Sequence, residues 1–163
     1  MARQVLSDAS PLIGLALVDG LPWLGVLFGS VLVPQEVWGE VVGRGFSEEA
    51  SLHSAQAAGW LEVAHPAPLP LHPPLPDLDE GEAACIRLAL AGQGPALLLM
   101  DERAGRAVAQ GFGLQVTGIA AVIGMAKVRG LIPAAKPVLE RLHLSDFRIA
   151  AEVIRTVLRR VGE

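Results

Sequence analysis

Four acidic side chains that lie far apart in the sequence are the residues of this chain best suited to chemistry: Asp8, Glu40, Glu82 and Asp101. Asp8 and Asp101 each follow a short apolar run that predicts a β-strand, whereas Glu40 and Glu82 fall in segments with a helical pattern. Carboxylates brought together by folding raise each other's pKa values unless a cation offsets their charge. Oxygen ligands of this kind suit a hard divalent cation such as Mg²⁺, which usually keeps waters and substrate phosphates around it. The spacing therefore predicts a metal site that serves phosphoryl chemistry.

Composition limits the other possibilities. The chain has 163 residues, of which 52% are hydrophobic, and this suits one compact domain with a substantial core. Its formal net charge of −4 argues against a protein that holds long nucleic acid through backbone contacts alone, so any such contact must be local or metal-assisted. The single cysteine, Cys85, allows no disulfide within the chain and favours a cytoplasmic location. The apolar segment 9–35 is divided by Asp19, Gly20 and Pro22 into pieces too short for a membrane span.

Strand and helix patterns alternate along the chain. Strands are expected at 4–7, 31–33, 60–63, 96–100 and 114–117, and helices at 11–19, 23–28, 35–42, 48–58, 83–91, 103–110, 119–129, 131–142 and 145–161. This order predicts an α/β fold in which helices flank both faces of an open, mainly parallel sheet. Ligands in such folds bind outside the carboxyl ends of the strands, which is where Asp8, Asp101 and Thr117 are expected to lie.

Prolines recur between residues 66 and 76, too densely for a helix or a central strand. We interpret this segment as a surface connector rather than a domain boundary, because neither flank can close a sheet of its own. The expectation is therefore one domain over residues 1–163.

Several motifs, taken in order, resemble those of the PIN-domain family, and more narrowly those of a prokaryotic subgroup related to VapC-type toxins. The motifs are VLSDASPLI at 5–13, VPQEVWGE at 33–40, GEAACI at 81–86, LMDERAGR at 99–106 and VTG at 116–118. The chain departs from the usual pattern at Glu102, which replaces the second aspartate of a pair, at Gly105, which replaces an alanine, and at Ala84 and Cys85. None of these departures removes one of the four acids.

The resemblance implies a three-layer α/β/α sandwich with a central, mainly parallel sheet and a ribonuclease that depends on Mg²⁺ or Mn²⁺. It implies that Asp8, Glu40, Glu82 and Asp101 are the metal ligands and catalytic residues, with Ser10, Glu102, Arg106 and Thr117 as auxiliary candidates. It also implies an RNA substrate, a homodimer, and a small antitoxin protein as a partner if the chain is the toxin of a toxin–antitoxin pair.

Some of these residues have simpler structural interpretations. Asp8 could cap the helix that follows it, although Ser10, with Pro11 behind it, is the expected cap. Glu82 could complete a capping box with Asp79, and Glu36 competes with Glu40 for the crevice.

Residues outside the acidic set are given structural roles. The histidines, His53, His65, His72 and His143, lack the spacing of a zinc site. The arginines at 155, 159 and 160 are assigned to a solvated face that complements a helix dipole, and the tryptophans at 23, 38 and 60 to the core or a subunit interface.

Two other functions stay open. One is a non-catalytic binding or dimerisation module with the same fold, using an apolar surface of Trp23, Leu24, Leu27 and Phe28. The other is a phosphoacceptor receiver-like domain, which also combines an acidic pocket with Mg²⁺. A receiver would need its acidic pair early in the chain and a lysine after the last strand, whereas here the pair is late and Thr117 occupies that strand end.

Overall fold

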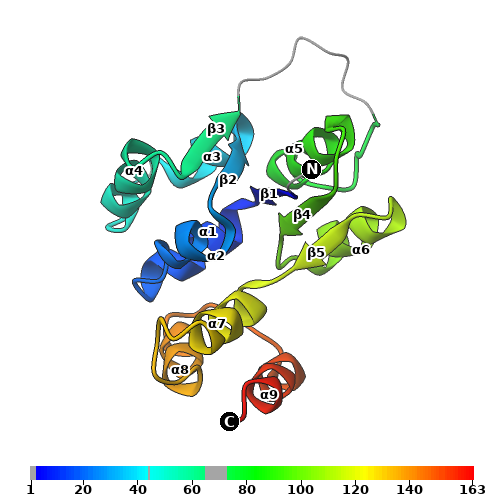
Figure 1. Ribbon diagram of the computed structural model, residues 1–163. Coiled ribbons are helices and arrows are strands. Elements are labelled where there is room, and N and C mark those ends of the chain that lie inside the picture. The colour runs from blue at the N-terminus through cyan, green and yellow to red at the C-terminus, as the bar shows by residue number, and fades with distance from the viewer. Residues whose placement is uncertain (1–2, 44, 65–72) are drawn as a thin grey trace.

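The computed structural model describes residues 3–43, 45–64 and 73–163. At its centre is a sheet of five parallel strands in the order β3-β2-β1-β4-β5 (Figure 1). The strands are β1 (Gln4–Ser7), β2 (Val31–Pro34), β3 (Leu61–Ala64), β4 (Ala96–Leu99) and β5 (Gln115–Thr117). The predicted α/β sandwich with a mainly parallel sheet is therefore confirmed.

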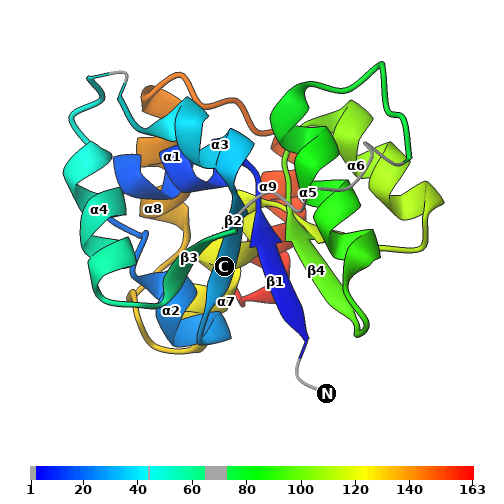
Figure 2. The ribbon, with the colours of Figure 1, turned by 90° about the horizontal axis from the view of Figure 1, so that it is seen from above.

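Helices cover both faces of this sheet, with α3 and α5 on one side and α7, α8 and α9 on the other (Figures 1 and 2). The helices are α1 (Ala9–Leu17), α2 (Trp23–Phe28), α3 (Gln35–Val41), α4 (Glu49–Ala57), α5 (Glu80–Ala91), α6 (Arg103–Gly111), α7 (Ile119–Val128), α8 (Lys136–Leu144) and α9 (Ala151–Arg160).

Central strands are apolar because both of their faces are covered. All four residues of β4 are buried, and in β1 only Gln4 is exposed. Parallel strands sandwiched between helices read as continuous apolar runs rather than as alternating ones. The carboxyl end of such a strand is the first place along it where a polar side chain can reach a crevice.

The strand order reverses between β1 and β4. These two strands run side by side with Ser7 opposite Leu99, and the Asp8 amide donates a hydrogen bond to the Leu99 carbonyl at 3.0 Å. A point where the order reverses is where an open parallel sheet leaves a crevice for ligands. Asp8 and Asp101 follow the two strands that border it.

Most strand and helix predictions agree with the structure to within three residues, but the start of α1 was wrong. Asp8, with an extended backbone (φ −76°, ψ 173°), is the N-cap, and Ser10 already lies inside the helix. Proline is tolerated anywhere in a first helical turn, so Pro11 did not mark the first position.

The two C-terminal helix predictions were also wrong in part. Residues 131–135 precede α8, because Pro133 cannot lie in a helix interior. Residues 145–150 precede α9, and Asp146 there adopts a positive φ of 62°, which no helix accommodates.

Two functional alternatives are affected by the fold. Leu24, expected on an apolar subunit surface, is fully buried in the core, so that surface was wrongly assigned in part. The strand order also differs from the flavodoxin-like order 2-1-3-4-5 of receiver-type folds, which excludes the receiver interpretation. No helix in the described part of the chain is long and apolar enough to cross a membrane.

The predicted connector at 66–76 lies partly outside the described residues, which resume at 73. That residues 1–163 form one domain stays a prediction. His65 and His72 also lie outside the described ranges, whereas His53 and His143 are exposed, and the His53 ring packs edge-on against Trp38.

Candidate acidic metal site

Asp8 is the most deeply placed acid of the site. It follows β1 directly and is only 4% exposed. Burial raises the pKa of its carboxyl group to about 7, and the negative charges of Asp79, Glu82 and Glu40 add to that rise, while the Ala9 backbone N–H opposes it. A buried carboxylate with a raised pKa and acidic neighbours stands in a region of uncompensated negative charge.

Glu40 reaches the same place from α3. A Cβ added at Gly81 would lie 2.7 Å from Glu40 Oε1 and 3.2 Å from Asp8 Oδ1. These two oxygens are therefore no more than about 6 Å apart, the sum of the two distances. Only glycine at position 81, in the first turn of α5, leaves room for both carboxylates. The rival of Glu40 on the same helix, Glu36, is exposed.

Glu82 completes this group from the first turn of α5. It is 5% exposed, and burial raises its pKa, as do the charges of Asp79, Glu102 and Glu40. Its backbone N–H donates to Asp79 Oδ1 at 2.8 Å, and the Asp79 backbone N–H acts in return on the Glu82 carboxyl group and lowers its pKa. The Asp79 side chain therefore caps α5, and Glu82 carries one of the charges that act on Asp8.

Asp101, the fourth acid, contacts the start of a neighbouring helix. Its Oδ1 accepts a hydrogen bond from the Ile119 N–H at 3.0 Å, at the start of α7, and a Cβ at Gly118 would lie 2.6 Å from that oxygen. Burial raises the Asp101 pKa to about 6, the Ile119 N–H and the Arg106 charge lower it, and Glu102 raises it. The second oxygen of Asp101, Oδ2, is buried without a hydrogen-bond partner among the described residues.

The auxiliary candidates are divided between these two regions. Ser10 is partly exposed in the first turn of α1, and Glu102 is exposed at the N-cap of α6, where its charge raises the pKa values of both Glu82 and Asp101. Arg106 donates from Nη1 to the Met100 carbonyl at 2.9 Å and lies beside Asp101. Thr117, at the end of β5, lines the same pocket as Asp101 and Arg106.

The donor chemistry of the acidic group, here Asp8, Glu40, Glu82 and Asp79, fits a divalent cation. All its side-chain donors are carboxylate oxygens, and two of them lie close together across Gly81. Within those residues, no three side chains converge tightly enough to form a closed metal cage. This geometry suits Mg²⁺ or Mn²⁺ held by one or two carboxylates and water, rather than a fully coordinated structural ion.

One comparison with known proteins agrees with this fold. The family model DUF3368, described as a PIN domain, matches residues 4–163, so the chain belongs to the PIN-domain family. Proteins of this family are nucleases in general, act on nucleic acids and generally use divalent metals. Searches of curated proteins and of solved structures found no significant match.

Sequence reasoning treated two features of the site too narrowly. Asp79 was considered only as a helix cap, yet its charge also raises the pKa values of Asp8 and Glu82. Arg148 was not singled out, although it lines the Asp101 pocket together with Arg160. The position of Asp79 three residues before Glu82 was a usable signal, whereas Arg148 lies in a loop with no pattern that could reveal its role.

Proposed function

We propose that this PIN-domain protein is a Mg²⁺- or Mn²⁺-dependent ribonuclease. The observation that carries the proposal is the close approach of the Asp8 and Glu40 carboxylates across Gly81, with Glu82 as a charged neighbour, beside the point where the strand order reverses. Carboxylates brought this close raise each other's pKa values, and a divalent cation is the group that would relieve their repulsion.

Asp8 and Glu40 are the residues that would hold the cation, because their oxygens approach each other across Gly81. When bound, the cation supplies a water of lowered pKa and neutralises charge on the substrate phosphodiester. Glu82 lies next to this pair, and burial raises the pKa of its carboxyl group, which makes the carboxylate a better proton acceptor. Asp101 follows the neighbouring strand and is the second candidate for orienting the water.

The test is hydrolysis of a fluorescent single-stranded RNA in MnCl₂ by the wild type and by Asp8→Asn. We expect Asp8→Asn to lose at least about 100-fold in rate, since loss even of a partner that orients a metal ligand commonly lowers metal affinity or activity 10–100-fold. Glu36→Gln is the matched control, because it removes an exposed carboxylate from the helix that carries Glu40, and it should stay within about twofold. Equal rates for Asp8→Asn and wild type would show that the activity does not come from this site.

A non-catalytic binding module is the second candidate function. It is favoured by one observation: the Oδ1 atom of Asp101 already accepts a hydrogen bond from the Ile119 N–H. Calorimetric titration with Mn²⁺ separates the two functions. The nuclease requires binding that Asp8→Asn abolishes, whereas a module needs no bound metal and would show no heat at millimolar Mn²⁺.

The finer implications of the resemblance stay predictions. These are the VapC-like subgroup, a toxin role with an antitoxin partner, the homodimer and a cytoplasmic location. Metal ligation by all four acids, with Asp101 among them, also stays a prediction.

A further inference from the structure

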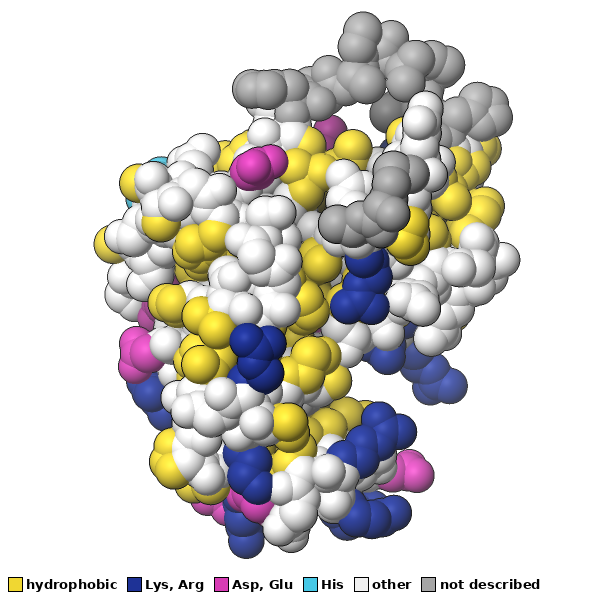
Figure 3. Space-filling view, viewed as in Figure 1, with side chains coloured by type: hydrophobic (Ala, Val, Ile, Leu, Met, Phe, Trp, Pro, Cys, Tyr) yellow, Lys and Arg dark blue, Asp and Glu magenta, His cyan; other side chains and the backbone are white. Residues whose placement is uncertain are grey.

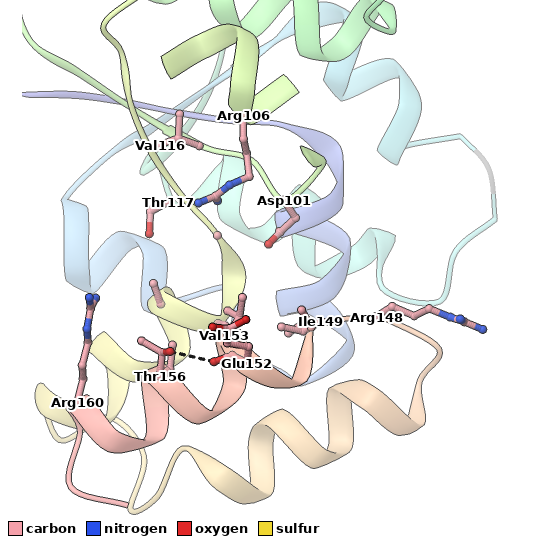
Figure 4. Close-up of a pocket in the computed structure, with 15 residues that line it drawn as sticks. Asp101, Arg106, Val116, Thr117, Arg148, Ile149, Glu152, Val153, Thr156 and Arg160 are labelled. Atoms are coloured by element: carbon pink, nitrogen blue, oxygen red, sulfur yellow. Dashed lines mark hydrogen bonds between the residues drawn. The ribbon is translucent and has the colours of Figure 1, made fainter. Parts of the chain in front are cut away.

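The structure contains a cavity whose chemistry differs from that of the acidic group. This cavity, here called the arginine pocket, has a volume of about 630 Å³ and lies between the ends of β4 and β5, the start of α7, and α9 (Figure 4). Asp101 forms part of its wall together with Arg106, Arg148 and Arg160. A pocket of this size can hold a small ligand or a short piece of a polymer.

The three arginines approach the pocket from different elements. Arg106, from α6, reaches between Asp101 and Thr117, while Arg160, at the end of α9, stands at one side of the pocket (Figure 4). Arg148, in the loop before α9, extends toward solvent at the opposite side (Figure 4). In the space-filling view, Lys and Arg side chains border the hollow at the right edge of the molecule from above and below (Figure 3).

Two of these guanidinium groups have no partner in the described part of the chain. None of its ion pairs or side-chain hydrogen bonds involves Arg148 or Arg160. Arg141, by contrast, is paired with Asp19 at 3.0 Å. Unpaired guanidinium groups that line one cavity are suited to phosphate, whose oxygens accept their planar N–H donors.

We propose that the arginine pocket binds the phosphate backbone of single-stranded RNA and directs it to the acidic group. This inference rests on the proposed ribonuclease function. Arg148 and Arg160 contact phosphates at the two ends of the pocket, and Arg106 faces the strand between them. The pocket meets the acidic region at Asp101, which follows β4, while Asp8 follows the adjacent strand β1.

The walls of the pocket favour a single strand over a duplex. A single strand can thread into a cavity bounded by α9 on one side and the sheet edge on the other, whereas a duplex is too wide to enter it and presents its phosphates on a broad outer surface. Binding through phosphates alone predicts tolerance of base sequence and a strong dependence on salt.

One carboxylate in the pocket opposes this binding. Glu152, in the first turn of α9, lines the cavity and places a negative charge near the proposed path. Its removal should therefore tighten RNA binding. The proposal therefore predicts that removing Glu152 strengthens RNA binding while removing the arginines weakens it, which is a stricter test than a loss of affinity alone.

Fluorescence anisotropy with a labelled oligouridylate tests the proposal, in EDTA so that metal-dependent hydrolysis cannot occur. We expect Arg148→Gln and Arg160→Gln each to raise Kd about three- to tenfold, and the double variant to lower the salt slope by about 1.4, since each phosphate contact of a single strand contributes about 0.7. Arg159→Gln is the matched control, because Arg159 precedes Arg160 on α9 and is exposed but does not line the pocket. It should change Kd less than twofold, and Glu152→Gln should lower Kd.

Equal effects of Arg159→Gln and Arg160→Gln would overturn the proposal, because they would show a diffuse charge effect rather than a site. Tighter binding of duplex than of single-stranded RNA would overturn it as well. The two proposals fail separately. RNA cleavage that requires Asp8 but has the same KM in the Arg148→Gln/Arg160→Gln double variant would leave the nuclease and remove the pocket. RNA binding that depends on the arginines, without any cleavage, would keep the pocket and remove the nuclease.

Discussion

The buried charge of Asp8 has a consequence for stability that can be measured before any substrate is known. Asp8 has a pKa of about 7 in the folded protein, against 3.8 for an unperturbed aspartate. The folded state therefore holds this proton more tightly than the unfolded chain does. The contribution of Asp8 to folding stability is largest below about pH 4 and falls as the pH rises toward 7.

The size of this effect follows from the shift. One pKa unit corresponds to about 1.4 kcal/mol, so ionising Asp8 in the metal-free protein lowers the free energy of unfolding by up to about 4 kcal/mol between pH 4 and pH 8. Asparagine has nearly the same shape and no charge. The Asp8→Asn variant should therefore lack this part of the pH dependence and be more stable than the wild type at pH 8 in EDTA.

Urea denaturation from pH 5 to pH 8 provides the assay, with EDTA present in one series and MgCl₂ in another. The difference in the free energy of unfolding between wild type and Asp8→Asn should grow with pH in EDTA. Both proteins should keep the part of the pH dependence that comes from Asp101 and Glu82. In MgCl₂ the wild type should recover stability and Asp8→Asn should not, because only the wild type retains the carboxylate that binds the ion.

Two results would refute this reasoning. If Asp8→Asn were less stable than the wild type by the same amount at every pH in EDTA, the Asp8 carboxylate would be a group that stabilises the fold rather than a buried charge that destabilises it. If Mg²⁺ stabilised both proteins equally, the ion would bind elsewhere. Glu36→Gln should show neither effect, since Glu36 is exposed.

Three further substitutions test other parts of the structure. Gly81→Ala should weaken Mn²⁺ binding measured by calorimetry, because its Cβ would lie 2.7 Å from Glu40 Oε1; unchanged affinity would mean that the two carboxylates do not share the ion. Cys85→Ser places a hydroxyl at a fully buried position and should lower the free energy of unfolding by about 1–3 kcal/mol in urea, whereas a neutral result would indicate a hidden hydrogen-bond partner. Glu163→Gln weakens the hydrogen bonds that Glu163 accepts from the backbone at the start of α8 and removes its ion pair with Lys127. The Tm should therefore fall. An unchanged Tm would show that these contacts do not hold the end of the chain.

The sequence predicted the parallel sheet because its central strands leave a simple signature. β1 was placed at its observed bounds and β4 to within one residue, since strands buried on both faces must be apolar throughout. The positions of Asp8 and Asp101 at the carboxyl ends followed directly. The approach of Glu40 to Asp8 could not be derived from periodicity, because it depends on how α3 and α5 pack and on the space that Gly81 leaves.

The orientation of Asp101 was beyond sequence reasoning for a different reason. Asp8 follows its strand immediately, whereas Asp101 stands two residues after Leu99, where the backbone has already left the sheet. Its side chain is held by the Ile119 N–H of a helix that begins 18 residues later. Such a contact depends on the docking of α7 and leaves no local pattern. The same holds for Arg148 and Arg160, which become neighbours of the site only when α9 packs beside it.

If the chain binds RNA as proposed, the separation of charge accounts for that binding despite the net charge of −4. Net charge governs long-range attraction, but at physiological ionic strength a charge is screened beyond roughly 8 Å, so the local arrangement decides binding. Here acids lie around Asp8 and Glu40, where a bound divalent cation would offset the local negative charge. Arginines line the pocket that contains Asp101. With the cation bound, both regions attract phosphate; without it, the acidic group repels the strand that the arginines hold. RNA affinity should therefore rise when Ca²⁺, added as a non-catalytic ion, replaces EDTA, and this rise should disappear in Asp8→Asn while the dependence on Arg160 persists.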